Sequence, residues 1–332
     1  MIAKFFRPAA LMVSLLLTFS LMPATQASAD SGARAEHQRI VDFWTKDKVA
    51  QAKPRDFVRD PATGTFSEAA LAASTTLGES WPGGGLVQKT TGKVLFAMGR
   101  YYYVCSASVI EDGDRTRSIV VTAAHCVFDN QKGEFATNWL FIPDYDSNAV
   151  ALTTSGSFCA ATTYGCWTAT SLVAHEGFTS QRKFNTQATL HDFAFAVVGL
   201  GGNGRALAQL DKTVGAQKIA FDAVAIGADT SLFGYPAAAP YAGKELIYSQ
   251  GPLGTDPLNN DQTYRVASDM TGGSSGGPWY APFNEGRGSG TTMSVNSYGY
   301  SGIIAMHGPM FNDKTAALFS AATTATTNTI VG

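Results

Sequence analysis

The stretch Val121-Thr122-Ala123-Ala124-His125-Cys126 decides how the rest of the chain is interpreted. The apolar run Ile119–Val121 lies shortly before the histidine, and a cysteine follows the histidine directly. Histidine is the natural general base of proteins, because its ordinary pKa lies near neutrality. A disulfide at Cys126 would fix the loop that carries His125. The pattern predicts a catalytic base at His125 rather than a purely structural histidine.

A second stretch, Gly272-Gly273-Ser274-Ser275-Gly276-Gly277-Pro278, contains the candidate nucleophile. A serine hydroxyl is a weak nucleophile that needs an adjacent base, and the oxyanion it creates needs backbone N–H donors. Glycines permit the tight loop and the close approach of substrate that this chemistry requires. A flexible linker is the alternative, but the apolar Trp279-Tyr280 follows at once. We therefore predict Ser275 as the nucleophile, and Gly273 and Ser275 as the oxyanion hole.

A third stretch, His191-Asp192-Phe193-Ala194-Phe195-Ala196, supplies the carboxylate. An aspartate at the start of a buried apolar strand is costly unless it is paired, and a histidine N–H is a suitable partner. We predict that Asp192 orients His125 and stabilises its imidazolium form. The other candidates for this role are Asp144, Asp146 and Asp211.

Taken together, the three stretches resemble the trypsin/chymotrypsin family of serine peptidases, and the pattern is similar to its bacterial trypsin-like and glutamyl-endopeptidase-like branch. The resemblance covers residues 92–332. The order His125, Asp192, Ser275 matches that family and differs from the orders in subtilisins and α/β-hydrolases. The resemblance implies two antiparallel six-stranded β-barrels with the triad in the cleft between them. It also implies hydrolysis of peptide bonds through an acyl-enzyme.

Two departures from trypsin concern activation. No Ile-Val-Gly-Gly sequence precedes the first expected strand, and Ser274 stands where trypsin-like zymogens carry an aspartate that pairs with the freed N-terminus. We therefore expect activation to consist of removing a propeptide that blocks or misfolds the cleft.

The pattern of residues after Gly92 predicts an all-β domain without reference to any family. Short runs rich in Val, Ile, Phe and Tyr alternate with Gly, Asp, Asn and Ser clusters, as in Val94–Met98, Phe193–Val198 and Gly302–Met306. Many short strands separated by turn signals indicate a β-sandwich or β-barrel. The Ala- and Thr-rich stretch Ala316–Thr327 predicts a short C-terminal helix.

The first 91 residues predict two segments outside this domain. Lys4 and Arg7, an apolar run to Met22 and the small residues Ala27-Ser28-Ala29 are typical of a secretory signal, so we expect residues 1–29 to be removed. A membrane anchor is the alternative, but the apolar run is short for a bilayer. Residues 30–91 have little strand periodicity and predict a propeptide and linker, with a helix over 37–52. The alternative is an extension that stays attached.

The four cysteines, Cys105, Cys126, Cys159 and Cys166, fit an exported protein with two disulfides. Three connectivities are possible. Cys159 and Cys166 are close enough in sequence to close a loop, which would leave Cys105 to pair with Cys126. Cysteine and histidine spacing does not fit a zinc site, so we expect neither a metal nor a cofactor.

Two residues bear on substrate preference. Asp269 lies six residues before Ser275, as does the acidic residue of trypsin's primary pocket, and would pair with Arg or Lys. A structural carboxylate is an equally weighted alternative, because residues 270–272 do not match trypsin. Glutamyl endopeptidases instead use a histidine on the strand after the nucleophile. His307 lies near that place, although a loop histidine is the simpler interpretation.

Composition and charge limit the partners. Hydrophobic residues make up 45% of the chain and charged residues 15%, and the formal net charge is −2 without a basic stripe. This is a globular composition that disfavours nucleic acid and anionic membranes as partners. We expect a monomeric, secreted (extracellular or periplasmic) enzyme acting on proteins or peptides. A catalytically inactive binding protein and an esterase are the rival classes. The complete triad disfavours the first, and the absence of a Gly-x-Ser-x-Gly elbow in the chain order Ser, Asp, His disfavours the second.

Overall fold

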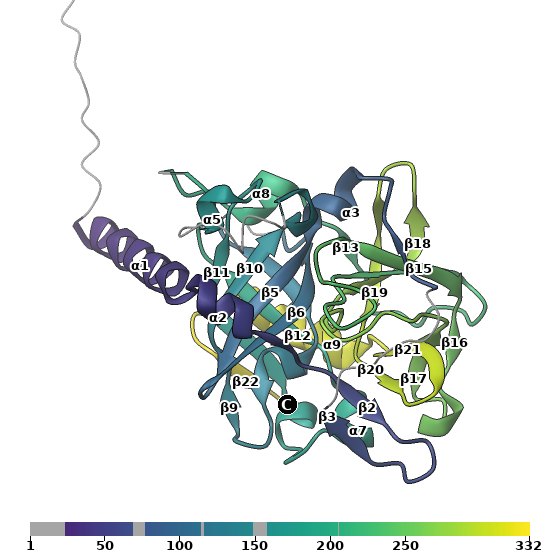
Figure 1. Ribbon diagram of the computed structural model, residues 1–332. Helices are drawn as coiled ribbons and strands as arrows, with labels where there is room; N and C mark the ends of the chain where they lie inside the picture. The colour runs from purple at the N-terminus through teal and green to yellow at the C-terminus, as the bar shows by residue number, and fades with distance from the viewer. Residues whose placement is uncertain (1–23, 69–76, 114–115, 149–157, 205) are drawn as a thin grey trace, which may run out of the picture.

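The computed structural model describes residues 24–68, 77–113, 116–148, 158–204 and 206–332, and Figure 1 shows their arrangement. The polypeptide forms a first barrel, a second β-rich half and an N-terminal region that lies against both. The predicted signal segment falls largely on residues 1–23, which are outside the described residues. Among those that are described, no helix is both long enough and apolar enough to cross a membrane.

The first barrel is a closed, antiparallel sheet of six strands. Its strands are ordered β6-β5-β10-β11-β12-β7, and pairing between β6 and β7 closes the ring. Their bounds are β5 (Thr91–Met98), β6 (Tyr101–Ile110), β7 (Ser118–Thr122), β10 (Thr137–Pro143), β11 (Trp167–His175) and β12 (Ala194–Val198). The expected six-stranded antiparallel barrel is confirmed here.

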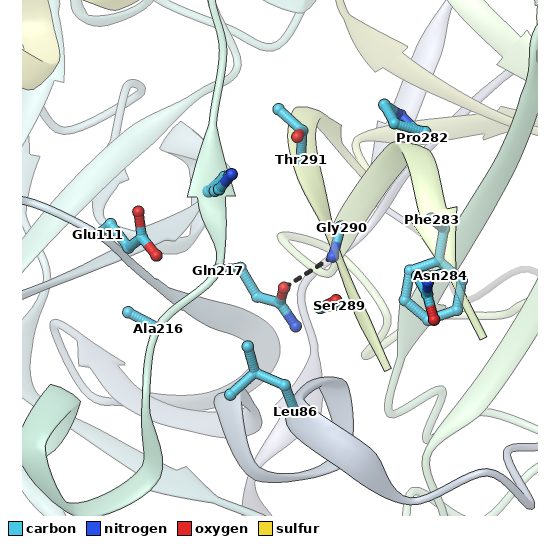
Figure 2. A pocket seen from close by; sticks show the side chains of 11 residues that line it. Leu86, Glu111, Ala216, Gln217, Pro282, Phe283, Asn284, Ser289, Gly290 and Thr291 are labelled. Carbon is cyan, nitrogen blue, oxygen red and sulfur yellow. Dashed lines mark hydrogen bonds between the residues drawn. The ribbon is translucent and has the colours of Figure 1, made fainter. Parts of the chain in front are cut away.

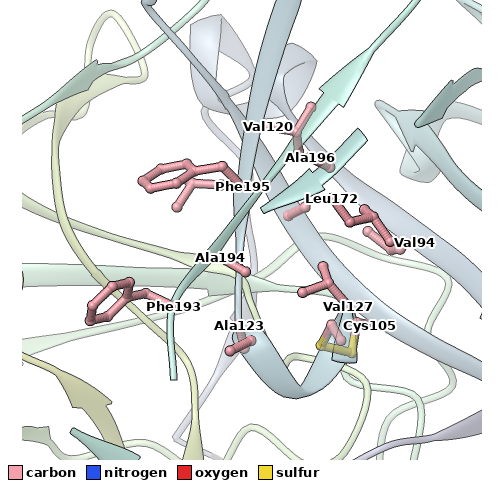
Figure 3. Packing of buried hydrophobic residues seen from close by; sticks show 14 of the residues in the cluster. Val94, Cys105, Val120, Ala123, Val127, Leu172, Phe193, Ala194, Phe195 and Ala196 are labelled. Atoms are coloured by element: carbon pink, nitrogen blue, oxygen red, sulfur yellow. A yellow bond between two sulfur atoms is a disulfide. The ribbon is translucent and has the colours of Figure 1, made fainter. Parts of the chain in front are cut away.

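The barrel is filled because several strands are buried along their whole length. Every residue of β7 and β12 is buried, which explains their continuous runs of Val, Ile, Phe and Ala. Figure 3 shows part of this core, which includes Phe195, Val120 and Leu172, with Val127 beside the disulfide at Cys105. This rigid packing holds the two loops that leave β7 and enter β12, and those loops carry His125 and Asp192.

The second half consists of two six-stranded sheets rather than one closed ring. One sheet has the order β13-β19-β18-β14-β15-β4 and the other β16-β17-β21-β20-β2-β3. Their bounds are β13 (Lys218–Ile219), β14 (Asp229–Gly234), β15 (Ile247–Pro252), β16 (Gly254–Thr255), β17 (Thr263–Val266), β18 (Pro278–Asn284), β19 (Ser289–Val295), β20 (Tyr298–Tyr300) and β21 (Ile303–Pro309). The remaining strands, β2 (Phe57–Arg59), β3 (Phe66–Glu68) and β4 (Glu79–Ser80), come from the N-terminal region.

Short helices and hairpins connect these strands. The connections are α3 (Gly85–Thr90), η1 (Ala124–Cys126), β8 (Phe128–Asp129), β9 (Glu134–Phe135), η2 (Tyr145–Asn148), α5 (Phe158–Ala161), α6 (Glu176–Thr179), α7 (Thr186–Thr189), α8 (Leu210–Val214) and η3 (Pro257–Asn259). The predicted C-terminal helix is α9 (Asp313–Ala322), followed by β22 (Thr329–Val331). It begins three residues earlier than expected, because Asn312 and Thr315 form a capping box at its start.

The N-terminal region, residues 24–80, contains α1 (Ala24–Phe43), α2 (Lys46–Gln51), β1 (Lys53–Pro54) and the strands β2 to β4. The helix expected over 37–52 is present as the end of α1 together with α2. Its short strands were not predicted. β1 is an edge strand that pairs in parallel with β6. β2 pairs in parallel with β20 and is followed by the edge strand β3. The segment between β1 and β2 therefore crosses from the first barrel to the second half.

Both disulfides predicted from the spacing are present. Cys105 is joined to Cys126, and Cys159 is joined to Cys166. The first ties β6 to the turn that carries His125. It therefore stabilises the position of the candidate catalytic base.

Candidate active site

His125 lies on the one-turn helix η1, directly after β7. Its Nδ1 is 2.8 Å from Oδ2 of Asp192, and its backbone N–H donates to Oδ1 of the same carboxylate at 2.9 Å. Both side chains are fully buried. The carboxylate thus fixes both the loop and the ring of His125. The predicted pairing of His125 with Asp192 is present in the structure.

A third donor to Asp192 was missed in the sequence. The Ser297 hydroxyl donates to Oδ2 of Asp192 at 2.5 Å. Ser297 lies between β19 and β20 in the second half, so this bond joins the two halves at the active centre. A serine between two strands carries no local signal for such a contact, because the partner is more than 100 residues away.

The rival carboxylates lie elsewhere. Asp144 and Asp146 both accept hydrogen bonds from the amide of Gln88. Asp211 accepts from the hydroxyl of Ser118 at 2.7 Å. Of the four aspartates considered from the sequence, Asp192 is the one hydrogen-bonded to His125.

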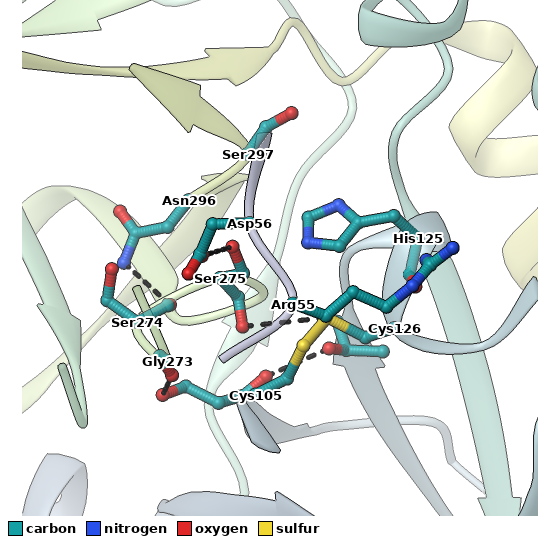
Figure 4. The surroundings of a disulfide bond; sticks show 12 residues. Arg55, Asp56, Cys105, His125, Cys126, Gly273, Ser274, Ser275, Asn296 and Ser297 are labelled. Atoms are coloured by element: carbon teal, nitrogen blue, oxygen red, sulfur yellow. Dashed lines mark hydrogen bonds between the residues drawn. A yellow bond between two sulfur atoms is a disulfide. The ribbon is translucent and has the colours of Figure 1, made fainter. Parts of the chain in front are cut away.

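Ser275 occupies a tight turn between β17 and β18. Gly273 and Gly276 adopt φ values of +99° and +81°, which side chains other than glycine rarely adopt. A Cβ on Gly276 would lie 2.1 Å from Oγ1 of Thr122, so the turn also packs closely against the first barrel. The backbone N–H of Ser106 donates to the carbonyl of Ser275 at 2.7 Å. These contacts place the serine at the boundary between the two halves, beside His125 (Figure 4).

The hydroxyl of Ser275 does not bond to His125. It donates to Oδ1 of Asp56 at 2.7 Å, and Nε2 of His125 has no hydrogen-bond partner among the described residues. Asp56 comes from the N-terminal region, between β1 and β2, and Figure 4 shows its carboxylate facing Ser275. The candidate nucleophile is therefore hydrogen-bonded to a carboxylate from a distant part of the chain and not to its expected base.

The Asp56 carboxyl group is enclosed. It is 6% exposed. Burial raises its pKa, while the hydrogen bond from Ser275, the charge of His125 and the backbone N–H of Gly273 oppose the rise. A Cβ on Gly272 would lie 1.8 Å from Oδ2 of Asp56, so the glycine makes room for this carboxyl group. The glycine-rich turn of Ser275 and the side chain of Asp56 therefore fit closely against each other.

The residues on either side of Asp56, Arg55 and Phe57, also contact the candidate site. The ring of Phe57 stacks on Phe184 with centroids 4.0 Å apart, and its edge meets His125 at 5.4 Å. The guanidinium of Arg55 donates to the carbonyl of His125. Residues 55–57 therefore contact the candidate base and the candidate nucleophile together. The sequence offered no sign of this, because the contacts are tertiary.

Asp269 is buried in the second half of the molecule. Its Oδ1 accepts hydrogen bonds of 2.7 Å from the Tyr241 hydroxyl and from the backbone N–H of Gly78. Its Oδ2 has no hydrogen-bond partner among the described residues. One carboxylate oxygen of Asp269 is therefore hydrogen-bonded within the protein, and the other is buried without a hydrogen bond from the described residues.

His307 is part of β21 and is almost fully buried. Its ring stacks on Tyr298 at 5.0 Å, and its Nε2 is 4.0 Å from Oδ1 of Asp256. Burial lowers the pKa of His307 to about 4. The hydroxyls of Tyr298 and Tyr300 donate to the other oxygen of Asp256. This arrangement makes His307 a strand residue in a buried polar cluster rather than a loop histidine.

A separate pocket of about 410 Å³ lies away from the triad, and Figure 2 shows the side chains that line it. Gln217 is its central polar group. The Gln217 amide donates to the carbonyl of Gly288 and accepts from the N–H of Gly290, both at 2.9 Å. His125, Asp192 and Ser275 are not among the residues that line this pocket, so it is not the candidate active site.

Comparisons with known proteins agree with this geometry. The structure is similar to that of protease Anisep from Arthrobacter nicotinovorans, with 32% identity and a TM-score of 0.59 over 77% of this chain and 100% of that one. It is also similar to the thermostable serine protease AL20 from an extremophilic microorganism, with 33% identity and a TM-score of 0.59 over 72% of this chain and 100% of AL20. A Glu endopeptidase matches at 15% identity with a TM-score of 0.56, over 77% of this chain and 100% of its own, which supports the fold alone.

No protein-family model matches the sequence, and no curated protein matches it significantly. The family assignment rests instead on two serine proteases that are about one-third identical and covered over their whole length. With its closed antiparallel barrel and with Ser275 beside a buried His125–Asp192 pair, the chain belongs to the trypsin/chymotrypsin-like serine peptidases.

Proposed function

We propose that this chain is the precursor of a secreted serine endopeptidase, with Ser275 as nucleophile, His125 as general base and acid, and Asp192 as the carboxylate that orients His125. The observation that carries the proposal is the buried pair of His125 and Asp192, held by three hydrogen bonds to one carboxylate, directly beside the glycine-rich turn of Ser275. No cofactor takes part in the proposed reaction.

The reaction proceeds in two halves. The Ser275 oxygen bonds to the peptide carbonyl carbon while its proton passes to Nε2 of His125, and the N–H groups of Gly273 and Ser275 donate to the resulting oxyanion. His125 then gives that proton to the departing amine as the C–N bond breaks, which leaves the acyl-enzyme. Water repeats the sequence: it loses a proton to His125, attacks the ester carbonyl and releases the acid, and Ser275 regains its proton.

The N-terminal region keeps the precursor inactive in this proposal. Asp56 presents a side-chain carboxylate to Ser275 where a substrate would present a peptide carbonyl. A side-chain carboxylate has no amine to release, so the segment occupies the centre without being cut at that place. Because Ser275 donates to Asp56, its proton is also directed away from His125. Removal of this segment restores the path of the proton from Ser275 to His125.

The sequence predicts that the removed part ends near residue 91. Contacts of the last residues before that point favour a boundary nearer the N-terminus. Trp81 packs edge-on against Phe233 and Tyr248 of the second half, and Val87 is completely buried. The backbone of Val87 also donates to the carbonyl of Gly288. We propose that residues from Trp81 onwards remain with the mature enzyme.

Replacing Asp56 with Ala should unmask Ser275 in the uncut precursor. The substitution removes the acceptor of a buried hydrogen bond, which contributes on the order of 1–2 kcal/mol to docking of the segment. We expect an organophosphonate reagent to label Ser275 about tenfold faster in the Asp56→Ala precursor than in the wild-type precursor. Intact-mass analysis reports the labelling and confirms that the chain is uncut. Equal labelling rates would contradict the blocking role of Asp56.

The Asp56→Asn variant separates the charge from the hydrogen bond. Asn retains an acceptor oxygen for Ser275, so labelling should remain slow. Burial raises the pKa of the docked Asp56 carboxyl. Docking of the N-terminal segment is therefore most stable at pH values below the ordinary aspartate pKa. It weakens as the pH rises through the raised pKa of the docked Asp56. Amide hydrogen exchange over residues 53–59 should show this loss of protection in the wild-type precursor and not in Asp56→Asn.

Export is part of the proposal. A signal at residues 1–29 would direct the chain to an oxidising compartment, and the two disulfides are typical of proteins that fold there. We propose an extracellular or periplasmic, monomeric enzyme whose substrates are proteins or peptides.

We further propose cleavage after Arg or Lys, with Asp269 as the anion that pairs with the cation. The free Oδ2 of Asp269 supports this assignment, because a buried and half-satisfied carboxylate is best complemented by a cation. The glutamyl-type alternative is less well supported. His307 is already packed against Tyr298 and lies beside Asp256, whose negative charge would repel an acidic substrate.

The Asp269→Ser variant tests this preference. Its kcat/KM for a substrate with Arg before the scissile bond should fall about 100-fold, because a desolvated charge pair is worth roughly 2–5 kcal/mol. Turnover of an otherwise identical substrate with Leu at that position should change little, which controls for the triad. Matched peptides that differ only at that position provide the measurement. A wild-type enzyme that prefers Glu or a large apolar residue would show that the Asp269 assignment is wrong, and His307 would then be the residue to substitute.

A further inference from the structure

Arg55 packs its side chain against the turn of the first barrel that carries the candidate base. The residue is 4% exposed. Its Nη1 donates to the carbonyl of His125 and lies 3.5 Å from the carbonyl of Phe128. Its Nη2 is 4.0 Å from Oδ1 of Asp129. Figure 4 shows the guanidinium directed towards the loop of His125, next to the Cys105–Cys126 disulfide. A charged group is thus almost completely enclosed within reach of the catalytic centre.

The partners of Arg55 belong mostly to the peptidase domain. His125, Phe128 and Asp129 are on η1 and β8, and the ring of Tyr103 on β6 lies 5.7 Å from the guanidinium carbon. The disulfide fixes the turn that supplies the first of these groups. Two residues of the N-terminal region also interact with Arg55: the ring of Phe57 lies 5.5 Å from its guanidinium carbon, and Glu68 contributes a negative charge. We refer to the groups of His125, Phe128, Asp129 and Tyr103 as the guanidinium pocket. This pocket remains when residues 53–68 leave.

The chemistry of the guanidinium pocket suits arginine. Burial lowers the pKa of Arg55, and the charges of Glu68 and Asp129 oppose the fall. Two carbonyl oxygens, a carboxylate and an aromatic face match the planar, five-donor fork of a guanidinium. A lysine ammonium is a point charge and cannot satisfy these separated acceptors at once. Lys132 is 3.8 Å from the other oxygen of Asp129, but its side chain is largely exposed.

We propose that the guanidinium pocket is a substrate subsite of the mature enzyme, selective for an arginine side chain and occupied by Arg55 in the precursor. The proposal rests on the proposed peptidase function. It differs from the Asp269 assignment, because the guanidinium pocket is built on the first barrel and Asp269 lies in the second half.

The place of the pocket indicates which part of a substrate it takes. His125 gives its proton to the departing amine, so the residues after the scissile bond lie on the imidazole side of the centre. The pocket opens beside the backbone of His125 itself. We therefore place the selected arginine at one of the first positions after the scissile bond.

The first test uses the full chain carrying Ser275→Ala, so that the enzyme cannot process itself. Arg55→Gln, Asp129→Asn and the double variant are compared by the rate at which an added protease releases the N-terminal region. Asn at residue 129 retains an oxygen for the backbone N–H of Gln131, which bonds to Oδ1 of Asp129 at 3.1 Å. Each single variant should speed release about tenfold, and the double variant should be no faster. A double variant whose acceleration is the product of the two single ones would overturn the pairing.

The second test uses the processed wild-type enzyme and peptides with one fixed residue before the scissile bond. Arginine, lysine or uncharged citrulline is placed at each of the next positions in turn. At one position, kcat/KM should be at least tenfold higher for arginine than for citrulline, with lysine closer to citrulline. Asp129→Asn should reduce that ratio to about twofold. The exposed Asp222→Asn is the matched control and should preserve it.

The two tests distinguish failure of this inference from failure of the proposed function. A processed enzyme that cuts no peptide would refute the peptidase function, whereas the release rates of the Ser275→Ala chain would still report on the pocket. Peptide cleavage with equal rates for arginine and citrulline at every position would overturn the subsite and leave the peptidase function intact.

Discussion

Replacing Ser275 with Ala should abolish peptide hydrolysis by the processed enzyme while leaving the protein folded. The hydroxyl is the atom that forms the acyl bond, and its loss in a triad enzyme lowers kcat by about 10⁴- to 10⁶-fold. Within the described part of the chain, the Ser275 side chain makes one hydrogen bond, to Asp56. We therefore expect little change in folding. Steady-state hydrolysis of a fluorogenic peptide measures the loss, after an added protease has removed the N-terminal region.

The neighbouring Ser274→Ala variant is the matched control for this result. Ser274 is equally buried, and its hydroxyl has no hydrogen-bond partner among the described residues. It should therefore keep most of the wild-type activity. Retained turnover in Ser275→Ala together with loss in Ser274→Ala would move the nucleophile by one residue and refute the assignment.

Replacing Asp192 with Asn should lower kcat by about 10⁴-fold. The carboxylate accepts from the backbone N–H of His125, the Ser297 hydroxyl and the His125 ring. The amide of Asn replaces one of the two acceptor oxygens with an NH₂ group, which donates and cannot accept from these N–H and O–H groups. A ring whose Nδ1 must accept carries its proton on Nε2, where it cannot take the proton of Ser275. The pH dependence and rate of peptide hydrolysis measure the defect.

The Asp144→Asn variant serves as the control for Asp192. Asp144 accepts a hydrogen bond from Gln88 and is one of the alternative carboxylates that the sequence contains. The Asp144→Asn enzyme should keep its peptidase activity. Normal hydrolysis by Asp192→Asn with an inactive Asp144→Asn would show that the wrong carboxylate had been chosen.

The parts of the site that could be predicted from sequence are those encoded by contiguous residues. The run before His125 fills β7, and the run after Asp192 fills β12, so burial pattern and chemistry coincide in single stretches. The turn of Ser275 could also be predicted, because its glycines allow positive φ angles and the close approach of neighbouring residues. The cysteine pairs followed from spacing in the chain.

The contacts of the N-terminal region could not be predicted in this way. Asp56 lies 219 positions before Ser275, and its neighbours form strands of two or three residues that exist through pairing with β6 and β20. Such edge strands need no hydrophobic alternation of their own, so the sequence resembles a linker. Ser297 was missed for a related reason, since its role depends on a partner in the other half.

The second half is the part of the fold whose strand arrangement differs in detail from the expectation. One closed six-stranded barrel was expected there, and two six-stranded sheets are observed. The strands β2, β3 and β4 of the N-terminal region extend their edges, and the β18–β19 pairing contains register shifts. In this structure the N-terminal region is part of both sheets.

Active-site labelling followed by mass spectrometry tests the central claim most directly, namely that Ser275 is a nucleophile masked by Asp56. An organophosphonate should form one adduct per processed enzyme, located on Ser275 and matched by complete loss of peptidase activity. The uncut precursor should react many times more slowly. An adduct on another residue, or full peptidase activity in enzyme that the reagent does not label, would contradict the account.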